Sequence, residues 1–313
     1  MFNIPLSIGS FQLQHRLIQG PLAGFSCAPF RQLFSQYTPP AYCVSEMLSA
    51  HDVLHKHLFN GRYLYRSPDE KHLCYQISGT DPAIMADAAI KLEHSGADLI
   101  DINCGCPKTK IRKKGAGSAL LETSERLIEI IHAVRVAIQC PLTVKIRLQG
   151  NTQDLELARK IANAGVDALI VHGRRWNDDY DHPNDLQQIA RIKRAIDIPV
   201  IANGDISNAR TLNNALTKTG CDAFMISRAG TGQPWLFKEL LSEQSFSIDR
   251  PPLIFLFMMH LEGLAILESE HKAVLQSKSL VRYYFRNLAD PMFLQSFYAL
   301  SSLKAIEKAL SSI

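Results

Sequence analysis

The sequence has few features of a membrane, secreted, disulfide-bonded or metal-binding protein. Its longest apolar run, Leu253–Met259, is far shorter than the ~20 residues of a membrane-spanning helix, so no membrane contact is expected. The seven cysteines show no CxxC pair or zinc-ligand spacing, which predicts reduced thiols. No carboxylate or cysteine at ligand spacing accompanies His51, His55 and His57, so we expect no metal there. The N-terminus lacks a charged segment followed by an apolar core, and its first charged residue is Arg16. We therefore expect a cytoplasmic protein without a secretory signal.

The charge is nearly balanced, and the composition is that of a folded protein. The 313 residues include 34 Lys plus Arg against 30 Asp plus Glu, for a formal net charge of +4. A protein that follows a phosphate backbone needs clustered charge, so any basic contact surface must be local. With 46% hydrophobic and 20% charged residues, a disordered chain is excluded, and the length fits one large domain and one small one.

Short β-branched runs alternate with longer helical patterns from about Arg16 to about Leu241, as in βα units around a parallel sheet. Two of the helices are predicted over Asp81–His94, where Asp-Pro provides an N-cap and a first-turn proline, and over Thr123–Ile138. Eight such units in ~250 residues predict a (β/α)₈ TIM barrel, with a doubly wound open sheet as the alternative. The eight strands are expected over Arg16–Ala23, Tyr42–Met47, Leu73–Gly79, Asp98–Asn103, Leu142–Leu148, Ala168–Arg174, Pro199–Gly204 and Ala223–Arg228.

The alternation of side chains along four of these strands favours the barrel. Val144 and Ile146 would face the surrounding helices, which places Lys145 and Arg147 on the inner face. A purely structural interior would be filled with branched apolar side chains, whereas barrel enzymes place catalytic groups at the carboxyl ends of the strands. We therefore expect an active site at that end. The same alternation puts these further polar residues inside: Gln76, Ser78, Asp101, Asn103, Thr143, His172 and Arg174.

The pattern becomes purely helical after Asp249-Arg-Pro-Pro252, and we interpret the proline pair as a domain boundary. This divides the chain into a barrel domain, residues 1–244, and a small helical domain, residues 245–313. The rings of the Arg282-Tyr-Tyr-Phe-Arg286 cluster are expected mainly in the core of the helical domain. The alternative is that Arg282 and Arg286 present charge to a phosphate backbone. The three expected helices are Leu253–Glu270, Val274–Leu288 and Pro291–Ser312.

Two late turns of the barrel indicate a phosphate site. Asn203-Gly-Asp205 ends the seventh strand and Ser227-Arg-Ala-Gly-Thr-Gly232 ends the eighth, and each leads toward a helix whose free N–H groups can hold an anion. Barrels often bind phosphate at this place, and Arg228 adds a cation. The alternative is that these glycines only turn the chain. We expect a phosphorylated ligand.

The segment Asp101-Ile-Asn-Cys-Gly-Cys-Pro107 places two cysteines at the end of the fourth strand. A cysteine beside Gly and Pro in a loop on the active face can approach a substrate, whereas a structural cysteine more often lies within a strand or helix. Spacing alone does not separate Cys104 from Cys106. The run that follows predicts either a solvated loop or a local contact with nucleic acid. Its basic residues are Lys108, Lys110, Arg112, Lys113 and Lys114.

These segments resemble a known family, the tRNA-dihydrouridine synthases, which are flavoenzymes that reduce a uridine in the D-loop of tRNA. The matching motifs occur in family order across nearly the whole barrel, and the helical tail is similar to the family's RNA-binding domain. Two of the motifs, at residues 45–47 and 116–121, are most similar to the bacterial B type. The motifs are Gly20-Pro-Leu-Ala-Gly24, Ser45-Glu-Met47, Gln76-Ile-Ser-Gly-Thr-Asp-Pro82, Asp101-Ile-Asn-Cys-Gly-Cys-Pro107, Ala116-Gly-Ser-Ala-Leu-Leu121, Val144-Lys-Ile-Arg147, Val171-His-Gly-Arg174, Ile201-Ala-Asn-Gly-Asp-Ile206 and Gly232-Gln-Pro-Trp-Leu-Phe237.

The resemblance implies a barrel that binds FMN and a helical domain that binds tRNA. Cys106 matches the family's catalytic acid. Asn103 and Arg174 would lie near the uracil, and Lys108 and Arg282 would contact the surrounding tRNA. The implied flavin contacts are Pro21, Leu22 and Ala23 along the ring, Gln76 and Lys145 at its edge, His172 as a support, and Asn203, Gly204, Asp205, Ser227 and Arg228 at the phosphate end.

The implied reaction is reduction of the uracil C5=C6 bond with electrons from NADPH. Hydride would reach C6 from the flavin, whose reduced form Lys145 would stabilise, and Cys106 would protonate C5. An unperturbed thiol has a pKa near ~8.5 and therefore carries its proton at pH 7, as an acid must. The base must also be extruded from the folded RNA into the pocket. The alternatives are a small-molecule FMN oxidoreductase related to dihydroorotate dehydrogenase, an aldolase-like barrel with Lys145 as a Schiff-base amine, and an RNA-binding protein without catalysis.

Two segments depart from the family's pattern. Phe25-Ser26-Cys27 stands where many relatives have Thr or Ser and then Asp, which changes the contacts near the flavin. Ser227-Arg228-Ala229 replaces a Gly-Arg-Gly type sequence and adds a side chain where the phosphate approaches, although the Ser227 hydroxyl can compensate. The sequence does not identify the modified uridine or separate NADPH from NADH. It leaves the oligomeric state open, with a monomer as our expectation.

Overall fold

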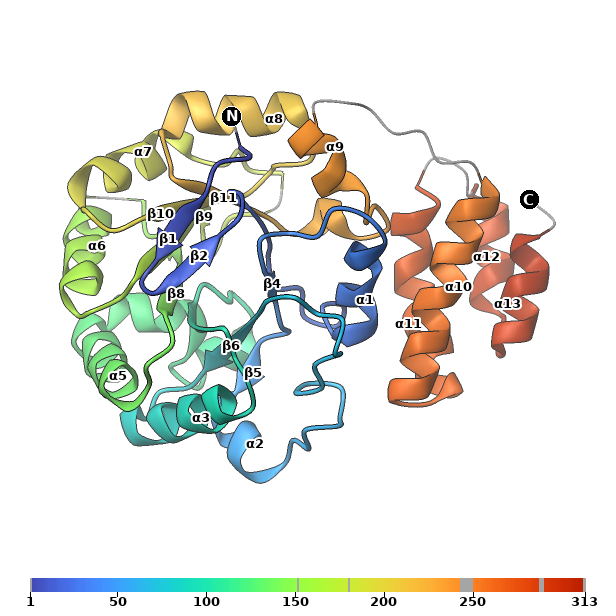
Figure 1. Ribbon diagram of the computed structural model, residues 1–313, viewed down its shortest axis with the longest axis horizontal. Coiled ribbons are helices and arrows are strands. Elements are labelled where there is room, and N and C mark those ends of the chain that lie inside the picture. The colour runs from blue at the N-terminus through green and yellow to red at the C-terminus, as the bar shows by residue number, and fades with distance from the viewer. Residues whose placement is uncertain (1, 151, 180, 243–249, 287–289, 312–313) are drawn as a thin grey trace.

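A closed ring of eight parallel strands forms the body of the protein (Figure 1). The computed structural model describes residues 2–150, 152–179, 181–242, 250–286 and 290–311. The ring closes because β4 pairs with both β3 and β6, while β3 pairs with β11. This confirms the predicted (β/α)₈ barrel over the open sheet. The strands in ring order are β3 (Leu17–Gln19), β4 (Cys43–Val44), β6 (Leu73–Ser78), β7 (Leu99–Cys104), β8 (Leu142–Leu148), β9 (Ala168–Arg175), β10 (Val200–Asn203) and β11 (Ala223–Ile226).

The predicted strands are all present, and most differ from the observed ones only at their ends. The strand over Leu142–Leu148 has the predicted limits. The strand expected over Arg16–Ala23 is much shorter, because Pro21 has no N–H to continue the ladder. The expected strand Tyr42–Met47 is reduced to β4, and a further short strand, β5 (Leu48–Ser49), pairs with the far end of β6.

Helices surround the ring and pack against its outward-facing residues. Asp81 caps α3 as expected, since its Oδ1 accepts a hydrogen bond from Ile84 N at 2.9 Å. Val144 and Ile146 are fully buried in the core between strands and helices. The helices of this layer are α1 (Ala28–Gln32), α2 (Ala50–His55), α3 (Pro82–His94), α4 (Thr109–Arg112), α5 (Ser124–Ala137), α6 (Gln153–Asn163), α7 (Leu186–Ala195), α8 (Ala209–Thr219) and α9 (Leu236–Ser242), with the 3₁₀ helices η1 (Leu33–Gln36), η2 (Gly117–Glu122) and η3 (Arg228–Gly230).

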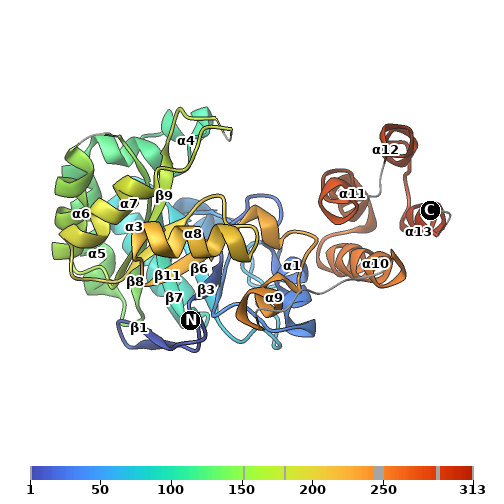
Figure 2. The same cartoon turned by 90° about the horizontal axis from the view of Figure 1, so that it is seen from above.

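An antiparallel hairpin, which we did not predict, covers the amino end of the barrel. It consists of β1 (Leu6–Ile8) and β2 (Phe11–Leu13). Ile8 and Leu13 are buried and pack with inward-facing residues of the strands, among them Ile18 and Ile201. Figure 2 shows the hairpin at the end of the barrel opposite α4. The other end of the ring is therefore the one available to a ligand.

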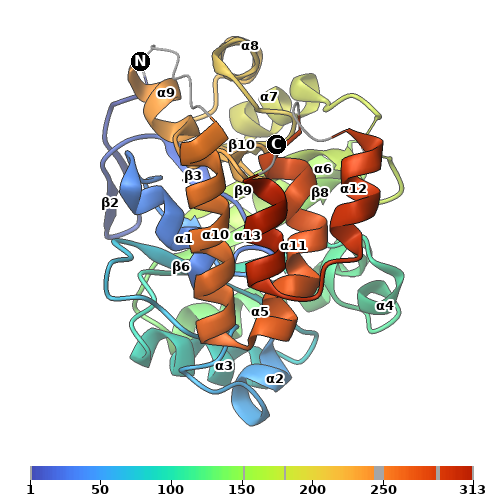
Figure 3. The same ribbon diagram turned by 90° about the vertical axis from the view of Figure 1, so that its right-hand side faces the viewer.

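Four further helices lie beside α1 and form a second hydrophobic cluster (Figures 1 and 3). They are α10 (Arg250–Leu267), α11 (Glu270–Tyr284), α12 (Pro291–Tyr298) and α13 (Leu303–Leu310). The prediction of a single helix over Pro291–Ser312 is wrong. The helix is interrupted at residues 299–302, and Ser302 caps a new helix. The helix expected from Leu253 begins three residues earlier, and that expected over Val274–Leu288 begins at Glu270 and ends at Tyr284, with Leu288 outside the described residues.

The domain boundary that we placed between residues 244 and 245 also falls outside the described residues. The second cluster contains residues from both sides of it, since Cys27, Leu33 and Trp235 pack with the four helices. Within the described ranges, no helix is both long enough and apolar enough to cross a membrane.

Candidate active site

Polar and charged side chains fill the barrel interior at the carboxyl ends of β6 to β9, as the side-chain alternation predicts. Lys145, Arg147, His172 and Arg174 are all buried there. Each belongs to the inward-facing set of its strand, while the residues between them pack outward. Four cationic or titratable groups therefore lie in the part of the interior that the hairpin does not cover.

A hydrogen-bonded network around Asp101 joins three of these strands. Gln76 Nε2 donates to Asp101 Oδ2 at 2.7 Å, and Thr143 Oγ1 donates to Asp101 Oδ1 at 2.6 Å. Asn103 Nδ2 donates to Gln76 Oε1 at 2.8 Å. Burial raises the pKa of the Asp101 carboxyl, against the opposing effect of the bonds from Thr143 and Gln76. The network fixes the orientation of the Gln76 amide.

Asn103 also holds the loop that carries Cys106. Its Oδ1 accepts hydrogen bonds from Cys106 N at 2.9 Å and from Gly105 N at 3.2 Å. From the other side, Arg147 Nε donates to Gly105 O at 3.0 Å. Asn103, which we expected near the uracil, thus has a positioning role in this structure, and the loop is fixed from two strands.

The structure separates the two cysteines that spacing left open. Cys104 is fully buried in the core between strands and helices, and burial raises its pKa well above the usual value. Cys106 lies in the loop and is partly exposed. Only Cys106 has the accessibility that a substrate contact requires.

Lys145 is a buried cation in the middle of this region. No described residue accepts a hydrogen bond from its ammonium group, and burial, followed by the charge of Arg147, lowers its pKa. Burial and the charges of Lys145 and Arg147 lower the pKa of His172 to about 2, so this imidazole is neutral at physiological pH. The charge of Asp101 opposes the shift at Lys145 but does not offset it, so the site is suited to a ligand with negative or electron-rich character.

The expected phosphate turns lie together but differ from our prediction in one respect. Ser227 is followed only by the three-residue η3, and Asn208 caps the start of α8 in a capping box with Thr211, so neither turn leads directly into an open helix N-terminus. Anion binding at the helix N-termini stays a prediction, and the capping box already satisfies Thr211 N in the first turn of α8. Backbone N–H groups of the turns themselves can still hold an anion.

These turns are held in an unusual backbone conformation. Gly204 has φ +118°, and a Cβ there would lie 2.7 Å from Asn184 Oδ1, so only glycine fits. Asp205 is the one described residue other than glycine with positive φ, at 55°. Arg174 fixes it through two hydrogen bonds to its carboxylate, of 2.9 and 2.8 Å. The side chains of Arg174 and Asp205, expected at the uracil and at the phosphate respectively, thus pair with each other.

The loop after β3 explains the first departure from the family's pattern. The partly exposed Pro21 and Leu22 and the exposed Ala23 begin it. Ser26 Oγ accepts a hydrogen bond from Leu22 N at 3.0 Å and closes the turn, while Phe25 packs edge-on against Tyr283 of α11. The departing residues therefore join the loop to the C-terminal helices.

Arg62 links the same loop to those helices at a second point. It donates to Glu46 Oε1 at 2.8 Å, to Gly24 O at 3.0 Å and to Gln276 Oε1 at 2.9 Å, and it also pairs with Glu268. Sequence analysis did not identify this residue. Its partners lie in segments far apart along the chain, so no local motif marks it.

Two expected tRNA contacts lie at the surface, away from the buried group. Lys108 is exposed at the start of the basic loop, and Arg282 is exposed on α11, where its Nε donates to Tyr298 OH at 2.6 Å. Tyr284 and Phe285 are buried in the helical cluster, as expected for core rings. Arg286 is exposed and donates to Thr231 O at 3.0 Å, which ties α11 to the loop after η3.

The residues at the carboxyl ends fit the flavin that the motifs imply. The Ser78 hydroxyl is buried, faces inward two residues beyond Gln76, and has no hydrogen-bond partner among the described residues. Together with the buried ammonium of Lys145, it offers donors to a polar ring edge. The Gly204 turn and the exposed Arg228 offer a cradle for phosphate.

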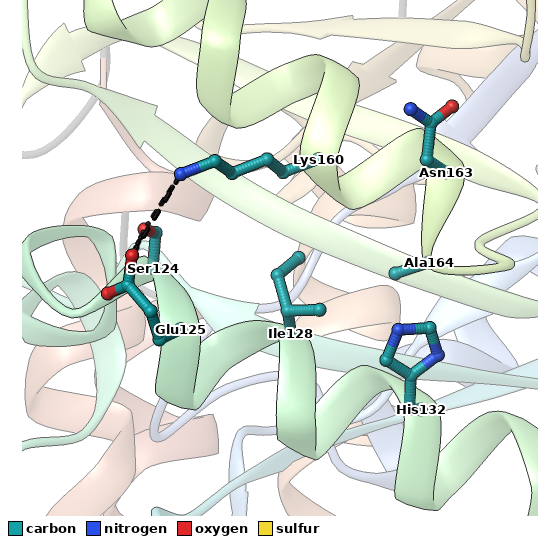
Figure 4. Close-up of a pocket in the computed structure, with 7 residues that line it drawn as sticks. All are labelled: Ser124, Glu125, Ile128, His132, Lys160, Asn163 and Ala164. Carbon is teal, nitrogen blue, oxygen red and sulfur yellow. Dashed lines mark hydrogen bonds and ion pairs between the residues drawn. The ribbon is translucent and has the colours of Figure 1, made fainter.

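A surface cavity lies away from this site, and the described residues contain no cluster that could hold a metal. No group of three or more His, Cys, Asp or Glu that could hold a metal occurs in the described ranges. A cavity of about 470 Å³ lies outside the barrel between α5 and α6 (Figure 4). None of the seven residues that line it is a predicted site residue.

Sequence analysis placed Asp101 and Arg147 on the inner face but assigned them no role. The structure gives Asp101 the centre of the Gln76 network and gives Arg147 one side of the Cys106 loop. The alternation along the strands was the signal for both. Side-chain direction alone could not reveal their partners.

The chain is similar in sequence to proteins of a known family. The model of the family described as Dihydrouridine synthase (Dus) matches residues 18–292. tRNA-dihydrouridine synthase B of Pseudomonas aeruginosa is 36% identical over 293 residues, which cover 90% of this chain and 87% of that protein. The protein of the same name from Proteus vulgaris is 34% identical over 316 residues, which cover 98% of this chain and 98% of that protein.

Solved structures share the fold at low sequence identity. Morphinone reductase has a TM-score of 0.57 at 13% identity, over 79% of this chain and 91% of its own. The old yellow enzyme homologue of Zymomonas mobilis has a TM-score of 0.52 at 14% identity, over 79% of this chain and 94% of its own. The family expected from the motifs is confirmed by the sequence comparisons: this chain belongs to the dihydrouridine synthase family.

Proposed function

We propose that this protein uses FMN and NADPH to reduce a D-loop uridine of tRNA to 5,6-dihydrouridine. The observation that carries the proposal is the juxtaposition of a buried Lys145 ammonium, a fixed Gln76 amide and an accessible Cys106 loop at one end of the barrel. Family membership favours this function over a small-molecule pyrimidine reductase and over an aldolase-like barrel. A tRNA substrate is consistent with a cytoplasmic location.

Bound FMN would supply hydride to C6 of the uracil. Lys145 and Gln76 would bind the pyrimidine edge of its ring, and the ammonium would offset negative charge there. His172, neutral because of its low pKa, would support the ring without adding charge. Asn203, Gly204, Asp205, Ser227 and Arg228 would hold the phosphate end, the first four through the turns and Arg228 through its charge. Pro21, Leu22 and Ala23 would lie along the ring.

Cys106 would donate the proton that completes the reduction. Its thiol proton goes to C5, and the resulting thiolate takes a proton from solvent. Asn103 and Arg147 keep the Cys106 loop in one position, which a proton donor needs in order to meet C5 rather than C6. Arg174 would lie near the uracil, held in place by Asp205.

The helical region, residues 245–313 in our proposed division, would bind tRNA together with the basic loop. Lys108 and Arg282 would contact phosphates on either side of the extruded uridine. The barrel, residues 1–244, would carry the chemistry. The helices would orient the tRNA, because Phe25, Arg62 and Arg286 fix them to the loops around the site.

Reconstitution with an unmodified tRNA transcript, FMN and NADPH tests this proposal. Mass spectrometry should find uridine converted to a product two hydrogens heavier. Cys106→Ala should retain FMN and NADPH oxidation and lose uridine reduction, whereas the matched variant Cys104→Ala should retain both activities. No reduced uridine with the wild-type protein would contradict the function, and normal turnover of Cys106→Ala would contradict the assigned donor.

A further inference from the structure

The surface beside the Cys106 loop contains an exposed aromatic side chain that the mechanism does not use. Trp176, just after β9, is 41% exposed. The guanidinium carbon of Arg112, in α4, lies 3.8 Å from the centroid of its ring. Figure 2 shows α4 and the segment after β9 at the same end of the barrel, opposite the hairpin. The two loops therefore meet at the mouth of the proposed active site.

The pair is connected to the backbone of the proposed proton donor. Arg112 Nη1 donates to Ser118 Oγ at 3.0 Å, and Nη2 donates to Glu122 Oε1 at 2.8 Å. The Ser118 hydroxyl donates in turn to Cys106 O at 3.0 Å, and Ser118 N donates to the same oxygen at 3.1 Å. Two side chains thus separate the indole from the Cys106 carbonyl, so whatever contacts Trp176 lies next to the substrate pocket.

The charges around Trp176 are divided between its two sides. On the α4 side four exposed residues are lysines, namely Lys108, Lys110, Lys113 and Lys114. Trp176 follows the exposed Arg175, and its own loop continues with Asp178 and Asp179; Asp178 accepts a hydrogen bond from Arg175 N at 2.7 Å. Carboxylates repel phosphate, so a nucleic acid here would contact the lysines with its backbone and the indole with a base.

We infer that Trp176, held by Arg112, is a stacking platform for the base next to the uridine in the pocket. The inference rests on the proposed function and names a contact with its tRNA substrate. Extruding one nucleotide unstacks its neighbour, and an ordered aromatic ring offers a replacement for the lost stacking partner. The Arg112 stack keeps the ring ordered before the RNA arrives.

Steady-state kinetics with tRNA test the platform. Trp176→Ala should raise the KM for tRNA about 5- to 100-fold, as loss of one base–aromatic stack does, with little change in kcat at saturating tRNA. Trp176→Phe, which still stacks, should stay within about threefold of wild type. A KM within twofold of wild type for Trp176→Ala, or equal damage from both variants, would overturn the inference.

Salt dependence separates stacking from charge. The ratio of KM values between Trp176→Ala and wild type should stay constant from about 50 to about 200 mM salt, while the corresponding ratio for Lys113→Ala should fall. A Trp176→Ala effect that disappears with salt would overturn the platform.

Fluorescence provides a readout that does not depend on turnover. The chain has two tryptophans, and the other, Trp235, is buried. Unmodified tRNA should quench wild-type emission, and Trp176→Phe should remove that quenching; equal quenching in both proteins would count against the contact. A wild-type protein that does not reduce tRNA would defeat the proposed function, whereas an active wild type with an unaffected Trp176→Ala would defeat the platform alone.

Discussion

The two ends of the barrel interior are built from the same strands but from different kinds of residue. Near the amino ends, the inward positions are apolar and pack with the hairpin; they include Ile18, Cys74, Leu99, Ile170 and Ile201. Two to four positions further along these or the adjacent strands, the inward residues are polar or charged: Gln76, Asp101, Lys145, His172 and Asn203. The first layer stabilises the ring, whereas the second places buried charge where it costs stability. Stability and ligand binding should therefore respond separately to mutation in the two layers.

The largest expected effect is on stability, in the apolar layer. Ile170→Ala should lower the free energy of unfolding by about 2–5 kcal/mol, because it leaves a cavity in a fully buried position, and Ile170→Val by about 0.5–1.5 kcal/mol. Urea unfolding measures both. FMN affinity, measured where the variant is still folded, should remain close to wild type. A large loss of FMN affinity in folded Ile170→Val would break the separation between the layers.

Lys145→Met, in the polar layer, should change ligand binding rather than stability. Removing the cation should weaken FMN binding by about 2–4 kcal/mol, as does loss of one member of a buried charged contact. Stability should be unchanged or higher, since burial and the charge of Arg147 disfavour the ammonium more than the charge of Asp101 favours it. Flavin fluorescence titration and urea unfolding on the same sample give both numbers. Wild-type affinity in this variant would remove Lys145 from the flavin site.

Asn103→Ala should separate positioning from binding within the polar layer. The variant leaves Gly105 N and Cys106 N without their acceptor, a loss of about 1–3 kcal/mol that should appear as a fall in kcat of about 10- to 100-fold. KM for tRNA should change little, because the phosphate contacts remain. An unchanged kcat would show that the Cys106 loop does not need this support.

Close to neutral pH, the smallest expected effect is the pH dependence of stability. Burial lowers the pKa of His172 to about 2 and that of His260, in the helical region, to about 3, whereas both titrate near 6.5 when unfolded. A histidine whose pKa is lowered by folding stabilises the folded protein fully above about pH 6.5. As the pH falls below about 6.5, the free energy of unfolding decreases by about 1.4 kcal/mol per pH unit for each such histidine. His260→Gln should reduce the slope between about pH 6.5 and 4.5, and the exposed His51→Gln should not. An equal dependence of stability on pH in wild type, His260→Gln and His51→Gln would contradict the lowered pKa of His260.

The sequence predicted the layers well because side-chain alternation is a local property. It placed Lys145, Arg147 and His172 inside, and all three are buried. It missed the hairpin, because Ile8 and Leu13 are buried only through contact with strands elsewhere in the chain. It likewise missed Arg62, whose partner Glu268 lies 206 positions away. Contacts that depend on the closed ring leave no local pattern.

A structure of the protein with bound FMN tests the central claim most directly. We expect the flavin ring to lie against Pro21, Leu22 and Ala23, with its pyrimidine edge at Gln76 and Lys145 and its phosphate at the Gly204 turn. Flavin bound elsewhere, or a ring whose pyrimidine edge lies away from Lys145, would contradict the claim that the polar layer is built for this cofactor.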